Sequence, residues 1–223
     1  MIRIFALCAI FPYVRGLVTS NQQVLEHTTS PRKVPVTLGV MSQCPDALYC
    51  ESVFDEVLKE VGDIVDLRLS FIGRINSTEP EHGVTCRHGP GECTGNIHEL
   101  CVASLYNSYT QWWPFVICSN GHGRFAVGTE EVSKECAHGL GLSWKKIKNC
   151  VDSDGKKGGE ALLKKSVSQT RELGIERSCT VIINGHKRCV RDDEEWKECE
   201  DGYGVADFVR TIREAHDSLV VAP

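Results

Sequence analysis

A cysteine at the start of a predicted helix is the residue in this sequence best placed for chemistry. Residues 36–40 form an apolar run, Cys44 and Pro45 follow it, and an amphipathic pattern then begins. Proline suits the first helical position because its φ is already helical and its missing N–H needs no partner there, so Cys44 falls at the N-cap. The helix dipole and the free backbone N–H groups stabilise a thiolate at that position. The pattern predicts a redox cysteine, and half of an ordinary disulfide is the alternative.

Length, charge and cysteine content limit the classes of protein to consider. The chain has 223 residues, a formal net charge of -5 and 12 cysteines. It is long enough to bury a substantial core. The acidic balance gives no electrostatic reason to expect nucleic acid or an anionic membrane surface as a partner. This many cysteines indicates an oxidising compartment and a set of disulfides.

The N-terminus predicts a signal peptide over residues 1–20, and a buried N-terminal strand or helix is the alternative. One positive charge precedes an apolar run that is too short to cross a bilayer. Its removal would take Cys8 away and leave an odd number of cysteines, so at least one thiol would be unpaired. No later segment is long and apolar enough for a membrane anchor. Asn76-Ser-Thr78 is the single N-glycosylation sequon.

The periodicity of apolar residues predicts the elements that position Cys44. A strand over 36–40, a helix over 45–61 and a strand over 64–72 imply a parallel βαβ unit. The later elements expected are a helix over 160–173, a hairpin over 179–190 that turns at Asn184-Gly185, and a helix over 203–219. This order is the thioredoxin arrangement, an α/β fold. We therefore expect a single thioredoxin-like domain over residues 34–219.

Between the two halves, residues 74–153 predict a disulfide-rich helical insertion. The polar loops and short helical pieces of this segment hold Cys86, Cys93, Cys101, Cys118, Cys136 and Cys150. None of these six lies in a clear strand, so we expect them to cross-link the insertion. The cluster over residues 112–115 is expected to form its core, and a binding patch is the alternative. His98 lies away from the cysteine-bearing face of its predicted helix, so it is expected to be exposed.

The segment from Cys86 to Cys101 resembles the signature of the gamma-interferon-inducible lysosomal thiol reductase (GILT) family. The matching residues are Cys86, His88, Gly89, Glu92, Cys93, Asn96 and Cys101. Arg87 replaces the glutamine that is usual in the family. The resemblance implies a thioredoxin-like fold with a disulfide-bonded insertion. It also implies a secreted or endolysosomal enzyme that reduces disulfides of protein substrates with an external thiol and uses no metal or nucleotide cofactor.

The sequence departs from the family at the centre of the expected active site. Carried over residue by residue, the family's Cys-x-x-Cys places the attacking cysteine on Cys44 but the resolving one on Ala47. On a regular helix the next cysteine, Cys50, lies roughly 9 Å further along the axis, whereas a disulfide needs Cα atoms within about 7 Å. Cys179 is a second candidate, because it falls where thioredoxin-like proteins place a cis-proline opposite the active cysteine. Cys50, Cys179 and an external thiol all remain candidates for resolving Cys44.

Two other functions compete with a reductase. The first is a non-catalytic, secreted, disulfide-rich binding protein that retains the fold without Cys-x-x-Cys. The second is a metal module built from Cys86, His88, Cys93 and Cys101. Structural zinc sites use paired Cys-x2-4-Cys spacing, which these residues lack, so we expect no metal.

Overall fold

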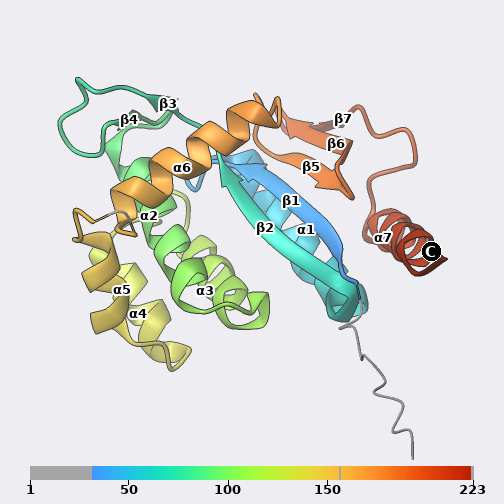
Figure 1. Ribbon diagram of the computed structural model, residues 1–223, viewed down its shortest axis with the longest axis horizontal. Coiled ribbons are helices and arrows are strands. Elements are labelled where there is room, and N and C mark those ends of the chain that lie inside the picture. Colours follow the sequence, from blue (N-terminus) through green and yellow to red (C-terminus); the bar gives the residue numbers. More distant parts are fainter. Residues whose placement is uncertain (1–31, 156, 222–223) are drawn as a thin grey trace, which may run out of the picture. The chain divides into compact units, whose positions relative to one another are not determined.

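The computed structural model describes residues 32–155 and 157–221 (Figure 1). The expected signal peptide and Cys8 lie outside the described residues. The described residues form one compact unit that combines a sheet with helices. Within the described ranges, no helix is both long and apolar enough to cross a membrane.

Five strands form a mixed sheet in the order β2-β1-β5-β6-β7. They are β1 (Val34–Val40), β2 (Val65–Phe71), β5 (Thr180–Ile183), β6 (His186–Asp192) and β7 (Glu195–Lys197). Strand β1 pairs in parallel with β2 and antiparallel with β5. It begins two residues earlier than expected, because Val34 and Pro35 already pair with β2. The carbonyl of Pro35 also accepts a hydrogen bond from the Asn184 N–H at 2.8 Å.

Helices cover both faces of this sheet (Figure 1). Helices α1 (Pro45–Val61) and α7 (Val205–Val221) pack together on one face, and α6 (Gly159–Glu172) crosses the other. A 3₁₀ turn, η1 (Gly62–Ile64), connects α1 to β2. Between α1 and α7, the ring centroids of Phe54 and Phe208 lie 5.1 Å apart. Burial of such large apolar side chains is the main source of stability at this contact.

The predicted hairpin is confirmed, and the structure adds a strand to it. Asn184 and Gly185 both have positive φ, 51° and 81°, as a two-residue hairpin turn requires. The chain turns again at Asp193 and Glu194, whose φ values are also positive, 54° and 61°. This second turn leads into β7, which sequence reasoning missed because acidic pairs are not typical of tight hairpin turns.

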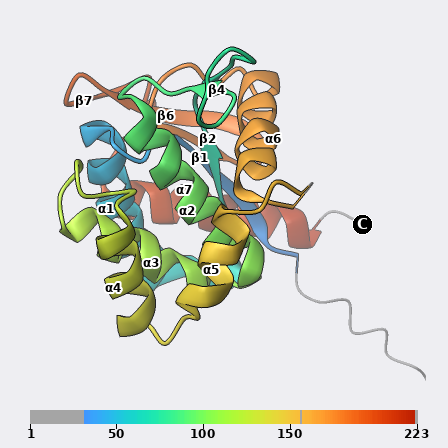
Figure 2. The ribbon, with the colours of Figure 1, turned by 90° about the vertical axis from the view of Figure 1, so that its left-hand side faces the viewer.

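The segment between β2 and α6 forms the helical insertion, which Figure 2 shows facing the viewer. Its elements are β3 (Arg74–Ile75), β4 (Val84–Thr85), α2 (Pro90–Leu105), α3 (Tyr109–Gly121), α4 (Glu130–Gly139) and α5 (Trp144–Val151). Its six cysteines form three disulfides, Cys86–Cys93, Cys101–Cys150 and Cys118–Cys136. The expected cross-linking of the insertion is therefore confirmed.

The core of the insertion corrects one expectation. Trp112 and Phe115 are buried, as predicted. His98, however, is only 4% exposed, so its expected exposure is wrong. Its ring lies edge-on to Trp144, and its Nδ1 lies 2.6 Å from the Ser133 hydroxyl. Burial lowers the pKa of His98 to about 4, so the ring is neutral at neutral pH.

Candidate active site

Cys44 occupies the N-cap of α1, as the sequence predicted. Its backbone is extended (φ -85°, ψ 127°), and Pro45 is the first helical residue. The carbonyl of Cys44 accepts the hydrogen bond from the Leu48 N–H at 3.1 Å, so α1 starts with a regular turn. The Cys44 side chain is 6% exposed and makes no capping hydrogen bond. The thiol therefore lies beside the helix terminus with its sulfur free of backbone donors.

The segment before β5 lies opposite this thiol. The sulfur of Cys44 lies 4.0 Å from the carbonyl oxygen of Ser178. The Ser178 hydroxyl accepts a hydrogen bond from the Met41 N–H at 3.2 Å, which ties the segment to the loop before α1. The peptide bond between Ser178 and Cys179 is cis. Cys179 thus lies next to the candidate nucleophile, where the thioredoxin-like order of elements placed it.

The two candidate resolving cysteines are bonded to each other. Cys50 and Cys179 form a disulfide with a Cα–Cα distance of 6.2 Å, and both are fully buried. Cys44 is unpaired and is the only free cysteine in the part of the chain that the structure describes. The regular first turn of α1 explains why Cys44 and Cys50 are not bonded, because six residues of helix hold them apart.

Residues of the 86–101 signature hold the loop that carries Cys44. The side-chain oxygen of Asn96 accepts a hydrogen bond from the Ser42 N–H at 3.0 Å, and its amide donates to the Cys86 sulfur at 3.7 Å. The Ser42 hydroxyl donates to the carbonyl of Glu92 at 3.1 Å. Because Ser42 is two residues before Cys44, these contacts fix the position of the thiol relative to the insertion.

A glycine outside the expected signature completes this contact. A Cβ placed on Gly95 would lie only 2.5 Å from the Ser42 hydroxyl, so the loop can approach α2 this closely only because residue 95 is glycine. On the same loop, the Gln43 amide donates to the carbonyl of Val127 at 2.8 Å. Nothing in the sequence alone pointed to Ser42, Gln43 or Gly95, because their roles depend on contacts with distant segments.

Most of the remaining signature residues lie at the N-terminal turn of α2, and none of them forms a reactive centre. Glu92 is fully buried, its Oε1 accepts the His88 N–H at 3.3 Å, and its Oε2 contacts His88 Nδ1. Gly89 has a φ of 96°, which favours glycine. Cys93 and Cys101 are held in disulfides. The signature therefore supports the Cys44 loop, and its three cysteines, all in disulfides, contribute no free thiol.

A buried ion pair lies in the first turn of α1, two residues after Cys44. Asp46 Oδ1 lies 3.2 Å from Arg191 Nε and accepts the Glu194 N–H at 3.0 Å. The Arg191 guanidinium also lies over the Tyr49 ring, 4.2 Å from its centroid. Pairing with Arg191 offsets the negative charge of Asp46, which would otherwise oppose a thiolate at the helix terminus. Sequence reasoning missed this pair because it joins α1 to β6.

Two buried carboxyl groups lie between α1 and the insertion. Burial raises the pKa of Glu51 to about 8, although the Asn120 amide, which donates to Glu51 Oε2 at 2.6 Å, partly opposes the rise. Burial also raises the pKa of Glu99 well above its usual range, and the charge of Glu51 adds to this effect. Both carboxylate oxygens of Glu99 are buried without a hydrogen-bond partner. At least one of the two groups is therefore protonated at neutral pH.

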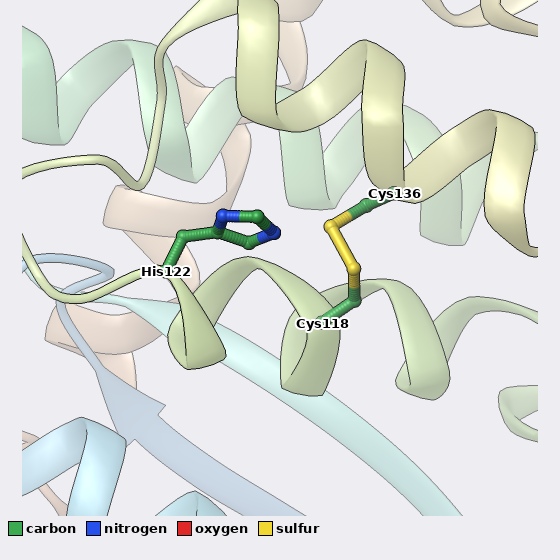
Figure 3. Close-up of side chains that lie close together, drawn as sticks. All are labelled: Cys118, His122 and Cys136. Atoms are coloured by element: carbon green, nitrogen blue, oxygen red, sulfur yellow. A yellow bond between two sulfur atoms is a disulfide. The ribbon is translucent and has the colours of Figure 1, made fainter.

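One cluster has the residue types of a metal site, but its two cysteines are not free to act as ligands. Cys118, His122 and Cys136 place their ligand atoms within 4.8 Å of one another. Figure 3 shows that the two sulfurs are joined in a disulfide, with the His122 ring beside it. Metal ions bind the thiolate form of cysteine, so this cluster does not fit a metal. The same reasoning rejects the metal module expected as an alternative, because Cys86, Cys93 and Cys101 are all in disulfides.

The possible glycosylation site lies on the turn that leads from β3. Asn76 is half-buried, and its amide donates to the Thr85 hydroxyl at 3.0 Å. Its side-chain oxygen accepts hydrogen bonds from the N–H and hydroxyl of Thr78, at 3.1 Å and 2.7 Å. These contacts show how the sequon folds and leave its modification a prediction.

Solved structures define the fold class as thioredoxin-like. A putative protein disulfide isomerase from Nitrosomonas europaea matches with a TM-score of 0.56 and 11% identity over 84% of this chain and 99% of its own. A putative protein-disulfide isomerase from Pseudomonas syringae matches with a TM-score of 0.53 and 16% identity over 82% of this chain and 94% of its own. The oxidoreductase NmDsbA1 from N. meningitidis matches with a TM-score of 0.51 and 17% identity over 88% of each chain. At these identities the likeness concerns the fold.

Sequence comparison then finds a family to which part of the chain is similar. The pattern described as "Gamma interferon inducible lysosomal thiol reductase (GILT)" matches residues 35–140, which include Cys44 and the whole signature. GILT-like protein 1 of Drosophila melanogaster is 29% identical over 158 residues, which cover 65% of this chain and 62% of that protein. The chain is therefore similar to the GILT family over residues 35–140, and it spans somewhat less than two thirds of this relative.

Proposed function

We propose that this protein is a thiol-disulfide oxidoreductase that reduces disulfide bonds of protein substrates through Cys44. One observation carries the proposal: the single free thiol of the described residues lies at a helix N-terminus in a thioredoxin-like fold. Similarity to the GILT family over residues 35–140 supports the same activity. Cys189, in β6, and Cys199, after β7, form a further disulfide. The resemblance to the family and the five disulfides of the described residues support a secreted or endolysosomal location.

The first chemical step follows from the position of Cys44. Its thiolate attacks one sulfur of a substrate disulfide, forms a mixed disulfide and expels the other substrate sulfur as a thiolate. The N-terminus of α1 stabilises the attacking thiolate, and Arg191 offsets the nearby charge of Asp46. An external thiol or a thiol of the protein then resolves the mixed disulfide.

A hollow beside the Cys44 loop offers room for the substrate chain. Its volume is about 270 Å³, and its walls include Met41, Arg87 and Glu176. Arg87 and Glu176 are exposed and carry opposite charges. We propose that a substrate segment lies here while its disulfide meets Cys44, and that Arg87, where the family usually has glutamine, contacts acidic side chains of the substrate.

The test is insulin-disulfide reduction in the presence of an external thiol, with the mature protein and its Cys44→Ser variant. Serine is a favourable N-cap residue, so the variant should keep its fold, which circular dichroism can verify. We expect the activity above the uncatalysed rate to be lost. Unchanged activity in the variant would overturn the proposal.

The alternative, a non-catalytic secreted binding protein, is favoured by the low exposure of Cys44, 6%. Alkylation of the native protein separates the two functions, because exchange needs a sulfur that a substrate can reach. Rapid labelling of Cys44 is expected for the reductase. A thiol that reacts only after unfolding would favour the binding protein.

A further inference from the structure

The Cys50–Cys179 disulfide differs from the other four in its relation to the free thiol. It joins α1, the helix that begins at Cys44, to the residue that precedes β5. Cys44 Sγ lies 4.0 Å from the carbonyl oxygen of Ser178, and that carbonyl is bonded directly to the nitrogen of Cys179. Covalent geometry then places the Cys44 sulfur within about 8 Å of the Cys179 Cα. Rotation about χ1 of the two cysteines is the motion that would close the remaining gap.

Burial determines which sulfur can react with this disulfide. Cys50 and Cys179 have no exposed surface, whereas Cys44 retains 6%. Thiol-disulfide exchange requires the attacking sulfur to touch a disulfide sulfur. A dissolved thiol or a protein substrate cannot touch Cys50 or Cys179 in the folded protein. Cys44 is therefore the route by which electrons can reach or leave the buried bridge.

We propose that Cys50 and Cys179 form a buried electron store that is filled and emptied through Cys44. This inference rests on the proposed function, since it requires Cys44 to exchange with external disulfides. It assigns the bridge a redox role in place of a purely structural one. The state seen here, with the bridge closed and Cys44 free, is then the oxidised, discharged state.

In the charged state all three cysteines are thiols. Cys44 thiolate attacks the substrate disulfide and expels one substrate thiolate, and Cys179 then attacks Cys44 Sγ and expels the second. Cys50 finally attacks Cys179 Sγ, which closes the buried bridge and releases Cys44 as a thiolate. One substrate disulfide becomes two thiols, the Cys50–Cys179 pair gives up two electrons, and its two protons end on the substrate thiols.

Geometry sets the order of the two internal steps. Cys44 and Cys50 are held apart by nearly two turns of α1, roughly 9 Å along its axis, whereas Cys179 follows the residue that contacts the Cys44 sulfur. Cys179 is therefore the residue that resolves the mixed disulfide. Recharging runs in reverse: Cys44 opens the bridge at Cys179, and two molecules of an external thiol regenerate Cys179 and Cys44 while they become one disulfide.

The test follows the opening of the bridge itself. The native protein and its Cys44→Ser variant are incubated with dithiothreitol, samples are alkylated at intervals, and mass spectrometry measures the opening of each disulfide. We expect Cys44→Ser to slow opening of Cys50–Cys179 at least about tenfold, because the route through Cys44 is removed. Cys189–Cys199 is the internal control, since Cys199 is partly exposed and its opening should be unchanged. Equal rates of Cys50–Cys179 opening in the two proteins would overturn the proposal that this bridge exchanges electrons through Cys44.

A second measurement separates this proposal from the proposed function. Mildly reduced protein, freed of external thiol, is mixed with an excess of a disulfide peptide. One peptide disulfide should be reduced per chain, and the product should contain Cys50–Cys179. If Cys44→Ser abolishes insulin reduction but the reduced protein yields no such bridge, the reductase stands and the store is wrong. If Cys44→Ser leaves insulin reduction unchanged, the proposed function itself fails.

Discussion

The thioredoxin-like part and the helical insertion use cysteine in opposite ways. The insertion closes its six cysteines into three disulfides among its own segments. The thioredoxin-like part leaves Cys44 free and places a disulfide beside it. From this difference we infer that the insertion supports the loop that carries Cys44, and that the proposed chemistry lies in the part with fewer cross-links. Asn96 and Gly95 connect the two, because they hold the loop that carries Cys44.

The largest expected effect, on the free energy of unfolding, comes from removing a disulfide of the insertion. Replacement of Cys101 and Cys150 by alanine removes a bridge that closes a loop with a sequence separation of 49. Loop entropy then predicts a loss of about 4 kcal/mol in the free energy of unfolding, measured by urea denaturation. The labelling rate of Cys44 in the folded variant should stay near that of the wild type. A large fall in that rate at low urea would show that the insertion does more than support.

The next effect tests the connection between the two parts. Asn96→Ala leaves the buried Ser42 N–H without a partner, which should cost about 1–3 kcal/mol. Insulin reduction should also fall, because the Cys44 loop loses its anchor. Asn107→Ala, at an exposed position after α2, is the matched control and should change neither quantity. Loss of stability without loss of activity would separate the signature from the positioning of Cys44.

A pH effect is expected where the two parts meet at Glu51. Its pKa in the folded protein, about 8, lies above the ordinary value of 4.5, so the folded state binds the proton more tightly than the unfolded state does. This contribution to stability is complete below pH 4.5 and is lost as the pH rises through 8. Melting temperature should fall by roughly 5 °C between pH 6.5 and 8.5. Glu51→Gln should flatten this fall, and an unchanged slope would contradict the assignment.

The smallest expected effect comes from His98 in the insertion. It lowers stability as the pH falls, whereas Glu51 lowers stability as the pH rises. The pKa of His98 is lowered by burial from 6.5 to about 4. The unfolded state therefore takes up a proton first as the pH falls, and stability present above pH 6.5 is lost as the pH falls through 4. His98→Gln should reduce the acid-side fall in melting temperature, even if the variant is less stable overall. If that fall is the same in the variant, His98 is not its cause.

The elements around Cys44 could be predicted because their signals are local. Pro45 marks the start of α1, and Asn184-Gly185 marks the hairpin, through backbone preferences that act within a few residues. The extra strand β7 escaped prediction because its turn is made by Asp193 and Glu194, a pair that lacks the glycine typical of such turns. The early start of β1 at Val34 depends on pairing with β2, which a proline nearby concealed.

The candidate site was predictable in its centre but not in its surroundings. Helix-start chemistry alone identified Cys44, and the resemblance to the family supplied Asn96. The pairing of Cys50 with Cys179 depends on which segments the fold brings together, and spacing along the chain does not encode that. The burial of His98 is of the same kind, since it comes from packing of α2 against α4 and α5 rather than from the periodicity of α2.

The long sequence separation of the Cys50–Cys179 bridge sets the order in which the protein matures during synthesis. Chains emerge from the ribosome N-terminus first, and Cys179 follows Cys50 by 129 residues, whereas Cys93 follows Cys86 by only 7. The bridges of the insertion can therefore close while Cys179 is still inside the ribosome. During that interval Cys44 and Cys50 are both thiols without Cys179 as a partner, and a formed helix α1 would hold them too far apart to join each other.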